Sequence, residues 1–478
     1  MKLLSGRTIT LLVLVMLTGV GLYHQVKPLP TGLAISPPPR PASEVRFLFD
    51  ATWVDASGQR RQQHQIFDHM LELISGARQL VLVDAFLIND FAGDPGRHRA
   101  LGQELAAALA KQQQLHPDLR VVLITDPFNT LYGGVENAYL AQLREHRIRV
   151  VETPLTPLRD PNPLWSSVWR ICCQWFGNDV GGGWLPNPVG DEPVTLRTYL
   201  ALLNFKANHR KTLLVDSPQG WVGLVSSGNP HDASSAHSNV ALRFDGDAVR
   251  DLYHSEKAVL DLAGVDTGEW SIPEPTDYAA TTSMPTVQLL TESRIRERVL
   301  ALLDKSSVGD QIRLSMFYFS HREIVAALID AHRRGARVQV LIDPSEDAFG
   351  RKKNGIPNRQ VAGELDDAGI EVRWCDTHGE QCHSKALLID RPDHRSALLL
   401  GSGNFTRRNL DDYNLETSVL LEADAGHRAV ADARELFLRQ WFNLDGQRFS
   451  VPYSHYQDDS RWRYLLYRIM EFSGLSTF

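Results

Sequence analysis

Residues 381–404 read QCHSKALLIDRPDHRSALLLGSGN, and residues 208–229 repeat much of their pattern as NHRKTLLVDSPQGWVGLVSSGN. Both stretches spell His-x-Lys, four residues and Asp, followed by a second apolar run that ends in Ser-Gly-Asn. Short, continuous apolar runs of this kind are typical of buried strands. A polar pattern that falls twice on such strands predicts one functional site built from two halves of the chain.

Further segments show that the duplication extends beyond these two stretches. Residues 120–127 (RVVLITDP) and 337–344 (RVQVLIDP) are nearly identical, and apolar strand-like runs precede them at 79–86 and 311–319. Residues with helical spacing lie between these runs in both halves. Helices that alternate with apolar strands indicate an α/β fold with largely buried sheets, so we expect two duplicated α/β lobes.

A chain of 478 residues is too long for one hydrophobic core, which also favours two lobes. We place lobe 1 at 44–270 and lobe 2 at 287–478, with a linker rich in Pro, Thr and Ala at 271–286. A membrane-targeting segment at 1–24 and a proline-rich spacer at 25–43 precede the lobes.

The targeting segment has a charged start and an apolar body. Lys2 and Arg7 precede sixteen uncharged, mostly apolar residues at 8–23, and no Ala-x-Ala cleavage site follows. The run is shorter than the roughly 20 residues of a comfortable membrane span, so an uncleaved signal anchor and a cleaved signal peptide both remain open. We favour the anchor, with the body on the non-cytoplasmic (periplasmic) side; a cleaved peptide would give a secreted protein.

Lobe 1 carries an insertion at about 153–200 that lobe 2 lacks. The interval from Ile148 to His209 is 61 residues, whereas the interval from Ile370 to His383 is 13. Five large aromatic residues gather in this insertion: Trp165, Trp169, Trp175, Phe176 and Trp184. Tryptophan is common where one end of a side chain is apolar and the other wet, including membrane interfaces. Two interpretations therefore stand: the insertion roofs the site and meets lipid, or it packs its own aromatic residues.

Charge and cysteine content narrow the function classes. The net charge of −7 and the pI near 6.2 argue against broad, sequence-blind binding of nucleic acid. No pair among the four cysteines has zinc-site spacing. A disulfide between Cys375 and Cys382 would suit an exported body, but we expect packed free thiols. The amphipathic aromatic run at 462–472 is expected to dock on the body as a last helix rather than on a membrane.

The paired motif has the residue types that phosphodiester cleavage needs. One imidazole can attack phosphorus and a second can protonate the leaving oxygen, which gives His209 and His383 their expected roles. Lys211 and Lys385 share a strand face with their histidines and can hold the phosphoryl oxygens. Four neutral donors are expected to bind the same phosphate: Ser227, Asn229, Ser402 and Asn404. The chemistry needs no metal, and the sequence shows no metal-ligand cluster.

The quoted motifs resemble those of the phospholipase D superfamily, whose members carry paired H-x-K-x4-D motifs. The segments Asn208–Lys211, Gly401–Phe405 and Asn414–Glu416 are most similar to the bacterial cardiolipin synthase and membrane phospholipase D branch. The resemblance implies two lobes, each a mixed, mostly parallel sheet flanked by helices, with the active site at their junction. It also implies a covalent phosphohistidine intermediate, no cofactor, and structural roles for the motif aspartates Asp216 and Asp390.

The resemblance further assigns Glu416 as the carboxylate that fixes a histidine tautomer. Because Glu416 belongs to lobe 2 and Ala241 stands at the matching place in lobe 1, we expect Glu416 to orient His383 and leave His209 without such a partner. We assign His209 as the nucleophile from lobe order. The other nearby histidines, His231, His237, His378 and His394, are interpreted as ordinary loop residues.

Two enzyme functions share these residues. The first is a phosphatidyltransferase or phospholipase D that acts on membrane phospholipids, with cardiolipin synthesis as one candidate reaction. The second is an exported nuclease-type phosphodiesterase. A third, non-enzymatic binding module is disfavoured because both histidines and both lysines are present. We favour the first, with phospholipid and a membrane surface as partners, no nucleic acid, and no need of an oligomer because one chain holds both motifs.

Overall fold

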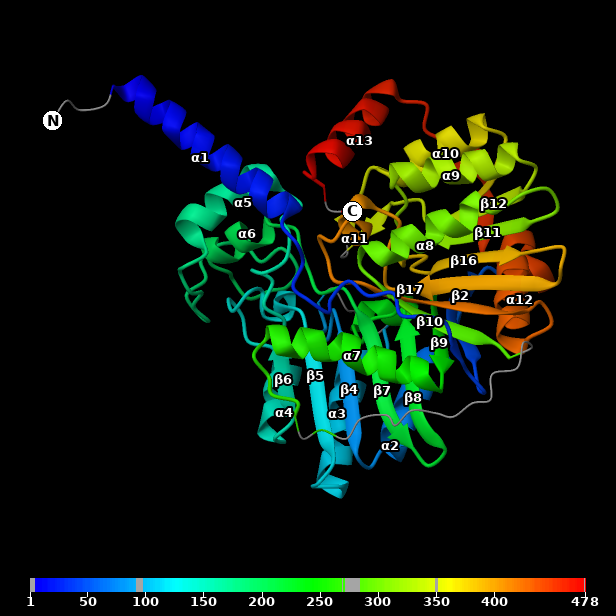
Figure 1. Cartoon of the computed structure of the whole chain (residues 1–478), viewed down its shortest axis with the longest axis horizontal. Coiled ribbons are helices and arrows are strands. Elements are labelled where there is room, and N and C mark those ends of the chain that lie inside the picture. Colours follow the sequence, from blue (N-terminus) through cyan, green and yellow to red (C-terminus); the bar gives the residue numbers. More distant parts are fainter. Residues whose placement is uncertain (1–4, 92–97, 269, 271–283, 349–350, 477) are drawn as a thin grey trace.

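The computed structural model describes residues 5–91, 98–268, 270, 284–348, 351–476 and 478, and it contains two large sheets (Figure 1). The expected linker at 271–286 falls mostly outside these residues. The sheet of lobe 1 has eight strands in the order β3-β2-β9-β8-β7-β4-β5-β6. Their bounds are β2 Arg46–Val54, β3 Arg60–Gln63, β4 Leu80–Ala85, β5 Arg120–Thr125, β6 Arg149–Glu152, β7 Lys211–Ser217, β8 Gly220–Ser226 and β9 Asn239–Phe244.

The sheet of lobe 2 has nine strands in the order β1-β10-β18-β17-β16-β11-β12-β15-β19. Their bounds are β1 Arg40–Pro41, β10 Thr286–Thr291, β11 Gln311–Met316, β12 Arg337–Ile342, β15 Glu371–Cys375, β16 Lys385–Asp390, β17 Arg395–Gly401, β18 Thr417–Asp424 and β19 Ser450–Pro452. A small hairpin, β13 Asp347–Ala348 with β14 Arg351–Lys352, lies apart from this sheet.

The two sheets share one plan, which confirms the duplication. The run β10-β18-β17-β16-β11-β12-β15 of lobe 2 has the same order as β2-β9-β8-β7-β4-β5-β6 of lobe 1. The mixed sheets agree with the sequence, but the expectation that they are mostly parallel is wrong. Only β4-β5-β6 and β11-β12-β15 pair in parallel, because helices connect those strands. The motif strands are joined by short turns, β7 to β8 and β16 to β17, and such turns pair strands antiparallel.

Helices cover the outer face of each sheet, and the inner faces pack together. Lobe 1 buries α2, α3 and α4 on its outer face, and lobe 2 buries α8, α9 and α10. Between the sheets lies one shared apolar core, which includes Leu82 and Leu214 of lobe 1, Leu398 and Val419 of lobe 2, and parts of α7 and α12. The helix bounds are α1 Gly6–Val26, α2 Ile66–Gly76, α3 Leu101–Leu115, α4 Ala138–Glu145, α5 Pro163–Val168, α6 Leu196–Leu202, α7 Asp247–Leu262, α8 Ser293–Asp304, α9 Arg322–Arg333, α10 Asn358–Asp367, α11 Arg407–Leu410, α12 Arg428–Phe442 and α13 Arg461–Ser473.

The apolar N-terminal helix α1 projects from the body (Figure 1). It is 21 residues long, apolar enough to cross a membrane, and only 6% of its most apolar window is buried. Its last turns rest on α5, where Gly21 lies against Pro163 and Ser167. The next segment, expected to be a spacer, is held by the body: Leu33 is buried, and β1 extends the sheet of lobe 2.

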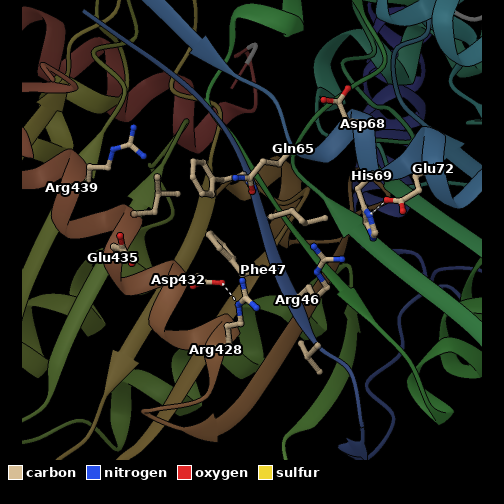
Figure 2. Close-up of a pocket in the computed structure, with 14 residues that line it drawn as sticks. Arg46, Phe47, Gln65, Asp68, His69, Glu72, Arg428, Asp432, Glu435 and Arg439 are labelled. Atoms are coloured by element: carbon tan, nitrogen blue, oxygen red, sulfur yellow. Dashed lines mark hydrogen bonds and ion pairs between the residues drawn. The ribbon is translucent and has the colours of Figure 1, made fainter. Parts of the chain in front are cut away.

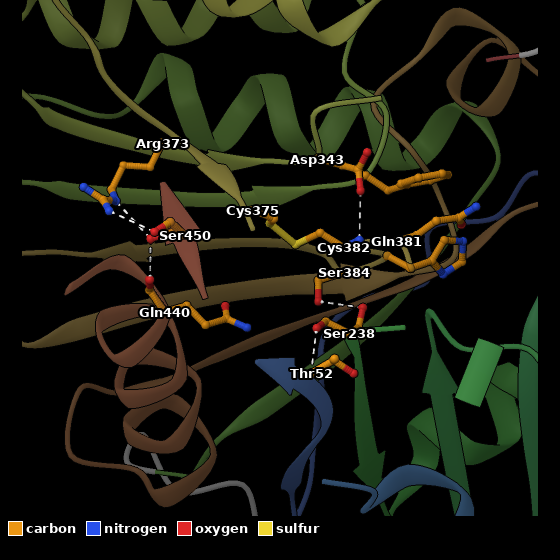
Figure 3. Close-up of a disulfide and its surroundings, with 12 residues drawn as sticks. Thr52, Ser238, Asp343, Arg373, Cys375, Gln381, Cys382, Ser384, Gln440 and Ser450 are labelled. Carbon is orange, nitrogen blue, oxygen red and sulfur yellow. Dashed lines mark hydrogen bonds between the residues drawn. A yellow bond between two sulfur atoms is a disulfide. The ribbon is translucent and has the colours of Figure 1, made fainter. Parts of the chain in front are cut away.

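The cysteines are paired, so the expectation of free thiols is wrong. Cys375 at the end of β15 is bonded to Cys382, which lies three residues before β16 begins at Lys385 (Figure 3). The intervening loop folds back and brings the two Cα atoms to 6.2 Å, which spacing along the sequence does not reveal. The adjacent Cys172 and Cys173 are bonded to each other. The loop closed by Cys375 and Cys382 leads directly into His383.

Removal of the Cys375–Cys382 bond should destabilise lobe 2. A cross-link over a sequence separation of 7 restricts the unfolded chain, and C375S/C382S should therefore lose about 2–3 kcal/mol of unfolding free energy. Urea unfolding of the full chain in detergent measures this loss. C172S/C173S is the matched control, because adjacent cysteines close almost no loop and their replacement should change stability far less. Equal losses in the two variants would contradict the prediction.

Candidate active site

The backbones around the two motif histidines interlock across the lobes. His209 and His383 each lie two residues before a central motif strand, β7 or β16. The His209 N–H donates to the carbonyl of Leu415 in lobe 2 (2.9 Å), and the Ser238 N–H of lobe 1 donates to the carbonyl of Gln381 (3.1 Å). Each histidine segment is therefore fixed by main chain of the opposite lobe.

Both histidines line one cavity of about 800 Å³ at the junction of the lobes. Asn229 and Asn404 also line it, and the side-chain oxygens of both are buried without a hydrogen-bond partner in the described part of the chain. Residues of the insertion and its end contribute to the wall: Pro188, Val189, Leu202, Phe205 and Lys206. The structure therefore brings together the two halves of the predicted site, and the insertion borders it.

The two motif lysines are buried beside their histidines. Lys211 Nζ donates to the carbonyl of His209 (2.6 Å), and Lys385 Nζ donates to the carbonyl of His383 (2.7 Å). A phenylalanine lies against each pair: Phe86 is 4.8 Å from the His209 ring between centroids, and Phe317 is 4.9 Å from the His383 ring. The sequence contained a signal for these phenylalanines, because Phe86 ends one of the two repeated strand-like runs and Phe317 lies two residues before the end of the other.

Glu416 orients His209, not His383, so that expectation is wrong. The His209 Nδ1 lies 2.9 Å from one Glu416 oxygen and 3.0 Å from the other. His383 Nδ1 lies 3.0 Å from Asn239 Oδ1. The equivalent of Glu416 in lobe 1 is Asn239 rather than Ala241. The interval from Asn404 to Glu416 is two residues longer than the interval from Asn229 to Asn239, which shifts a match made by counting residues. Each histidine thus takes its orienting side chain from the other lobe.

The two serines support these orienting groups and do not line the cavity, so their expected contact with phosphate is corrected. The Ser402 hydroxyl donates to Glu416 at 2.5 Å, and the Ser227 hydroxyl donates to Asn239 at 3.2 Å. Both serines are fully buried. Their hydroxyl groups are used by the side chains that hold the histidine rings.

The motif aspartates lie at the far ends of their strands. Asp216 accepts backbone N–H groups of residues 78–80, where β4 begins. Asp390 pairs with Arg313 and Arg434. Neither borders the cavity, and these contacts fit the structural role expected for both.

Burial lowers the positive charge that the basic side chains of the site carry near neutral pH. Removal from water lowers the pKa of His209 to about 4, although Glu416 acts to raise it. The same cause lowers the pKa of Lys211 to about 7 and holds the pKa values of His383 and Lys385 well below their ordinary range. The pKa of Glu416 is lowered, because His209 and Lys211 outweigh the opposing effect of burial. The pKa values of all four basic groups are therefore lowered by burial, and an anion bound among them would raise these pKa values and restore their charge.

A second cavity, of about 620 Å³, lies between β2, α2 and α12 (Figure 2). Two pairs among its lining side chains lie within one helix, His69 with Glu72 (3.0 Å) and Arg428 with Asp432 (3.7 Å). None of the motif residues lines it. The cavity at the two histidines is therefore the candidate active site. In the described residues, no group of three or more His, Cys, Asp or Glu side chains is arranged to hold a metal ion.

Parts of this chain are similar in sequence to known proteins. A family model described as "Cardiolipin synthase, PLD-like domain" matches residues 299–441. The mitochondrial cardiolipin hydrolase of Mus musculus is 30% identical over 165 residues, which are 34% of this chain and 66% of that protein. Phospholipase D of Rickettsia prowazekii (strain Madrid E) is 30% identical over 134 residues, 28% of this chain and 55% of that protein. The chain thus spans less than two thirds of either relative.

The solved structure of phosphatidylserine synthase from Haemophilus influenzae Rd KW20 superposes with a TM-score of 0.55 over 91% of this chain and 96% of that chain, at 12% identity. This likeness concerns the fold alone. Two duplicated α/β lobes with paired motifs at their junction define a class of phosphodiesterases and phosphatidyltransferases. The chain is a member of the phospholipase D superfamily.

Anion binding should draw protons into the site. A negative charge raises the pKa of nearby basic groups, and Lys211, with a pKa of about 7, is only half protonated at pH 7. Sulfate, which does not titrate near this pH, should therefore bind with an uptake of about half a proton or more. Calorimetry at pH 7 in two buffers of different ionisation enthalpy measures the uptake. Net proton release would contradict the charge state described above.

The orienting contacts should be needed for turnover. E416Q keeps an acceptor for His209 but removes the charge that raises its pKa, so kcat/KM should fall about 100-fold or more. N239A, which removes the contact to His383, should cause a loss of similar order. E435Q is the control, because Glu435 is exposed on α12 beside the second cavity. Activity of E416Q close to that of E435Q would exclude this role.

Proposed function

We propose that the protein is a membrane-associated phosphatidyltransferase or phospholipase D that works through a phosphohistidine intermediate. The observation that carries the proposal is the convergence of two oriented histidines on one cavity rich in basic groups. An anionic phosphodiester matches that cavity in charge, and family membership supports this reaction type. Cardiolipin synthesis is the candidate reaction within this class.

In the proposed first step, His209 Nε2 attacks phosphorus. A P–N bond forms, the bond from phosphorus to the alcohol oxygen breaks, and His383 gives its proton to that oxygen. In the second step, an entering alcohol or water gives its proton to His383 and attacks phosphorus, and the P–N bond breaks. A carboxylate partner favours His209 as the nucleophile, because Glu416 stabilises the positive charge that its ring gains on phosphorylation, whereas Asn239 is neutral.

The general acid must carry a proton, although burial lowers the pKa of His383 and favours its neutral form. The negative phosphodiester raises the pKa of His383 when it binds, which allows the ring to hold a proton at the start of the first step. Lys211 and Lys385, which lie behind the histidines and do not line the cavity, gain charge for the same reason and stabilise the phosphoryl group electrostatically. Asn229 and Asn404 line the cavity and offer their amide groups as further donors.

Lipid is the favoured substrate because apolar surface surrounds the cavity. Aromatic residues line it: Phe128, Tyr132, Phe205, Tyr318 and Phe478. In Figure 1, the projecting helix α1, the insertion with α5 and α6, and the last helix α13 all lie toward the same side of the molecule. Trp175 and Trp184 of the insertion are 75% and 71% exposed, and α13 docks through Tyr467 while Trp462 and Phe472 remain exposed. We propose that this side meets the membrane.

An anchored body on the non-cytoplasmic side completes the proposal. The helix α1 supports a membrane anchor by its length and composition. The Cys375–Cys382 disulfide supports an oxidising compartment, in which such bonds persist. Both motifs belong to one chain, so a single copy supplies the whole site.

The substrate class can be decided with purified full-length protein. Wild type and H383A are incubated with phosphatidylglycerol vesicles, phosphatidylcholine vesicles and single-stranded DNA. We expect cardiolipin or phosphatidic acid from wild type and a loss of at least about 100-fold in H383A. Cleaved DNA with untouched lipid would favour the nuclease-type phosphodiesterase. No turnover of any of the three would overturn the proposal.

The membrane-facing side can be tested separately. A W175A/W184A variant should bind anionic vesicles more weakly than wild type in a flotation assay, because both side chains are exposed. W165A is the matched control, since the Trp165 indole N–H donates to the carbonyl of Leu200 within the insertion (2.9 Å). Because α1 is apolar enough to enter lipid by itself, all proteins are compared without residues 1–26. Unchanged binding of W175A/W184A would show that the insertion only packs its own aromatic residues.

A further inference from the structure

Four histidines besides His209 and His383 line the cavity, and the one whose ring lies against His383 has no part in the steps above. His237 follows a short 3-10 helix at Asp232–Ala236 and lines the cavity of the two motif histidines. It is 8% exposed, and its ring centroid is 5.8 Å from that of His383. The sequence shows no counterpart of His237 in lobe 2 and predicts an ordinary loop residue. The structure corrects that interpretation.

The counterpart of His237 is Asn414. The Gln381 N–H donates to His237 Nδ1 (3.2 Å), and the Ala207 N–H donates to Asn414 Oδ1 (3.0 Å). Gln381 and Ala207 each lie two residues before a motif histidine. His237 and Asn414 each lie two residues before the side chain that orients that histidine, Asn239 or Glu416. The same position in the two lobes therefore holds an imidazole in one and an amide in the other.

These two side chains offer the same pair of functions. Because His237 Nδ1 accepts a hydrogen bond, the neutral ring must carry its proton on Nε2. Asn414 accepts through Oδ1 and is left with its Nδ2 donors. Both therefore accept a hydrogen bond from the backbone segment that leads to a motif histidine. Both also have an N–H donor left over and line the cavity. Within the described residues, neither donor makes a hydrogen bond to the protein.

The surroundings keep His237 neutral. Burial lowers its pKa well below the ordinary value, and His231, Lys385, His98 and Arg60 act in the same direction. A ring in this state is a fixed donor and not an acid–base group near neutral pH. Its role is therefore distinct from those of His209 and His383.

We propose that His237 is a substrate-binding residue on the His383 side of the site. Its Nδ1 holds the segment that carries His383, and its Nε2–H donates to an oxygen of the bound phosphodiester. Asn414 does the same on the His209 side with a smaller side chain. The inference rests on the proposed function and extends it, because it assigns a different donor to each half of the site.

The test compares H237N with H237F. Asparagine can accept from Gln381 and still donate, as Asn414 does, whereas phenylalanine keeps a planar ring without either nitrogen. We expect the affinity for inorganic phosphate, measured by calorimetry on the full chain, to fall about tenfold or more in H237F and to stay within about threefold in H237N. The kcat/KM on phosphatidylglycerol vesicles should follow the same order. H394N, on the exposed turn between β16 and β17, is the control.

The outcomes separate the possibilities. A residue that only holds the Gln381 segment would lower kcat in H237F and leave phosphate affinity unchanged, which would overturn the inference. Phosphate affinity that falls equally in H237N and H237F would also overturn it. If H237F shows no cooperative thermal unfolding, H237L replaces it, with the same expected loss of phosphate affinity. If wild type turns over no lipid, the proposed function fails, whereas the phosphate titration still decides the role of His237.

Discussion

The exchange of orienting side chains between the lobes is the constraint on which the site depends. Glu416 of lobe 2 holds His209 of lobe 1, and Asn239 of lobe 1 holds His383 of lobe 2. Neither lobe can therefore place its own histidine ring without the other. Duplication alone would give two half-sites. The contacts of Glu416 with His209 and of Asn239 with His383 join the two half-sites around one cavity.

Buried charge reinforces the same junction. Arg210, between His209 and Lys211, is fully buried and pairs with Glu292 at 2.8 Å, and Glu292 also accepts the backbone N–H of Glu416 at 3.2 Å. A buried ion pair is no strong argument for stability, but the removal of one partner is costly because the other is left uncompensated. The pair therefore couples the motif strand of lobe 1 to the orienting carboxylate of lobe 2. The difference between Glu416 and Asn239 then makes the two histidines chemically unequal, as a nucleophile and a general acid require.

Much of this could be predicted from the sequence, because the repeated strands and motifs identify the lobes and the residues His209, His383, Lys211 and Lys385 directly. The pairing of each histidine with an orienting side chain of the other lobe could not be predicted. It depends on a two-residue difference in loop length, which misaligned Glu416 with Ala241 and hid the equivalence of His237 and Asn414. The roles of Ser227 and Ser402 depend on hydroxyl direction, which a motif does not specify. The prediction of mostly parallel sheets considered the strands joined by helices, which pair in parallel. It left out the short turns after β7 and β16, which pair those strands with β8 and β17 antiparallel.

A crystal structure with a phosphate analogue such as vanadate tests the central claim most directly. The account predicts one anion in the cavity, within bonding or hydrogen-bond distance of the Nε2 atoms of both His209 and His383, with Glu416 still on His209 and Asn239 still on His383. Two separate anions, one in each lobe, or a single anion that reaches only one of the two rings, would contradict it.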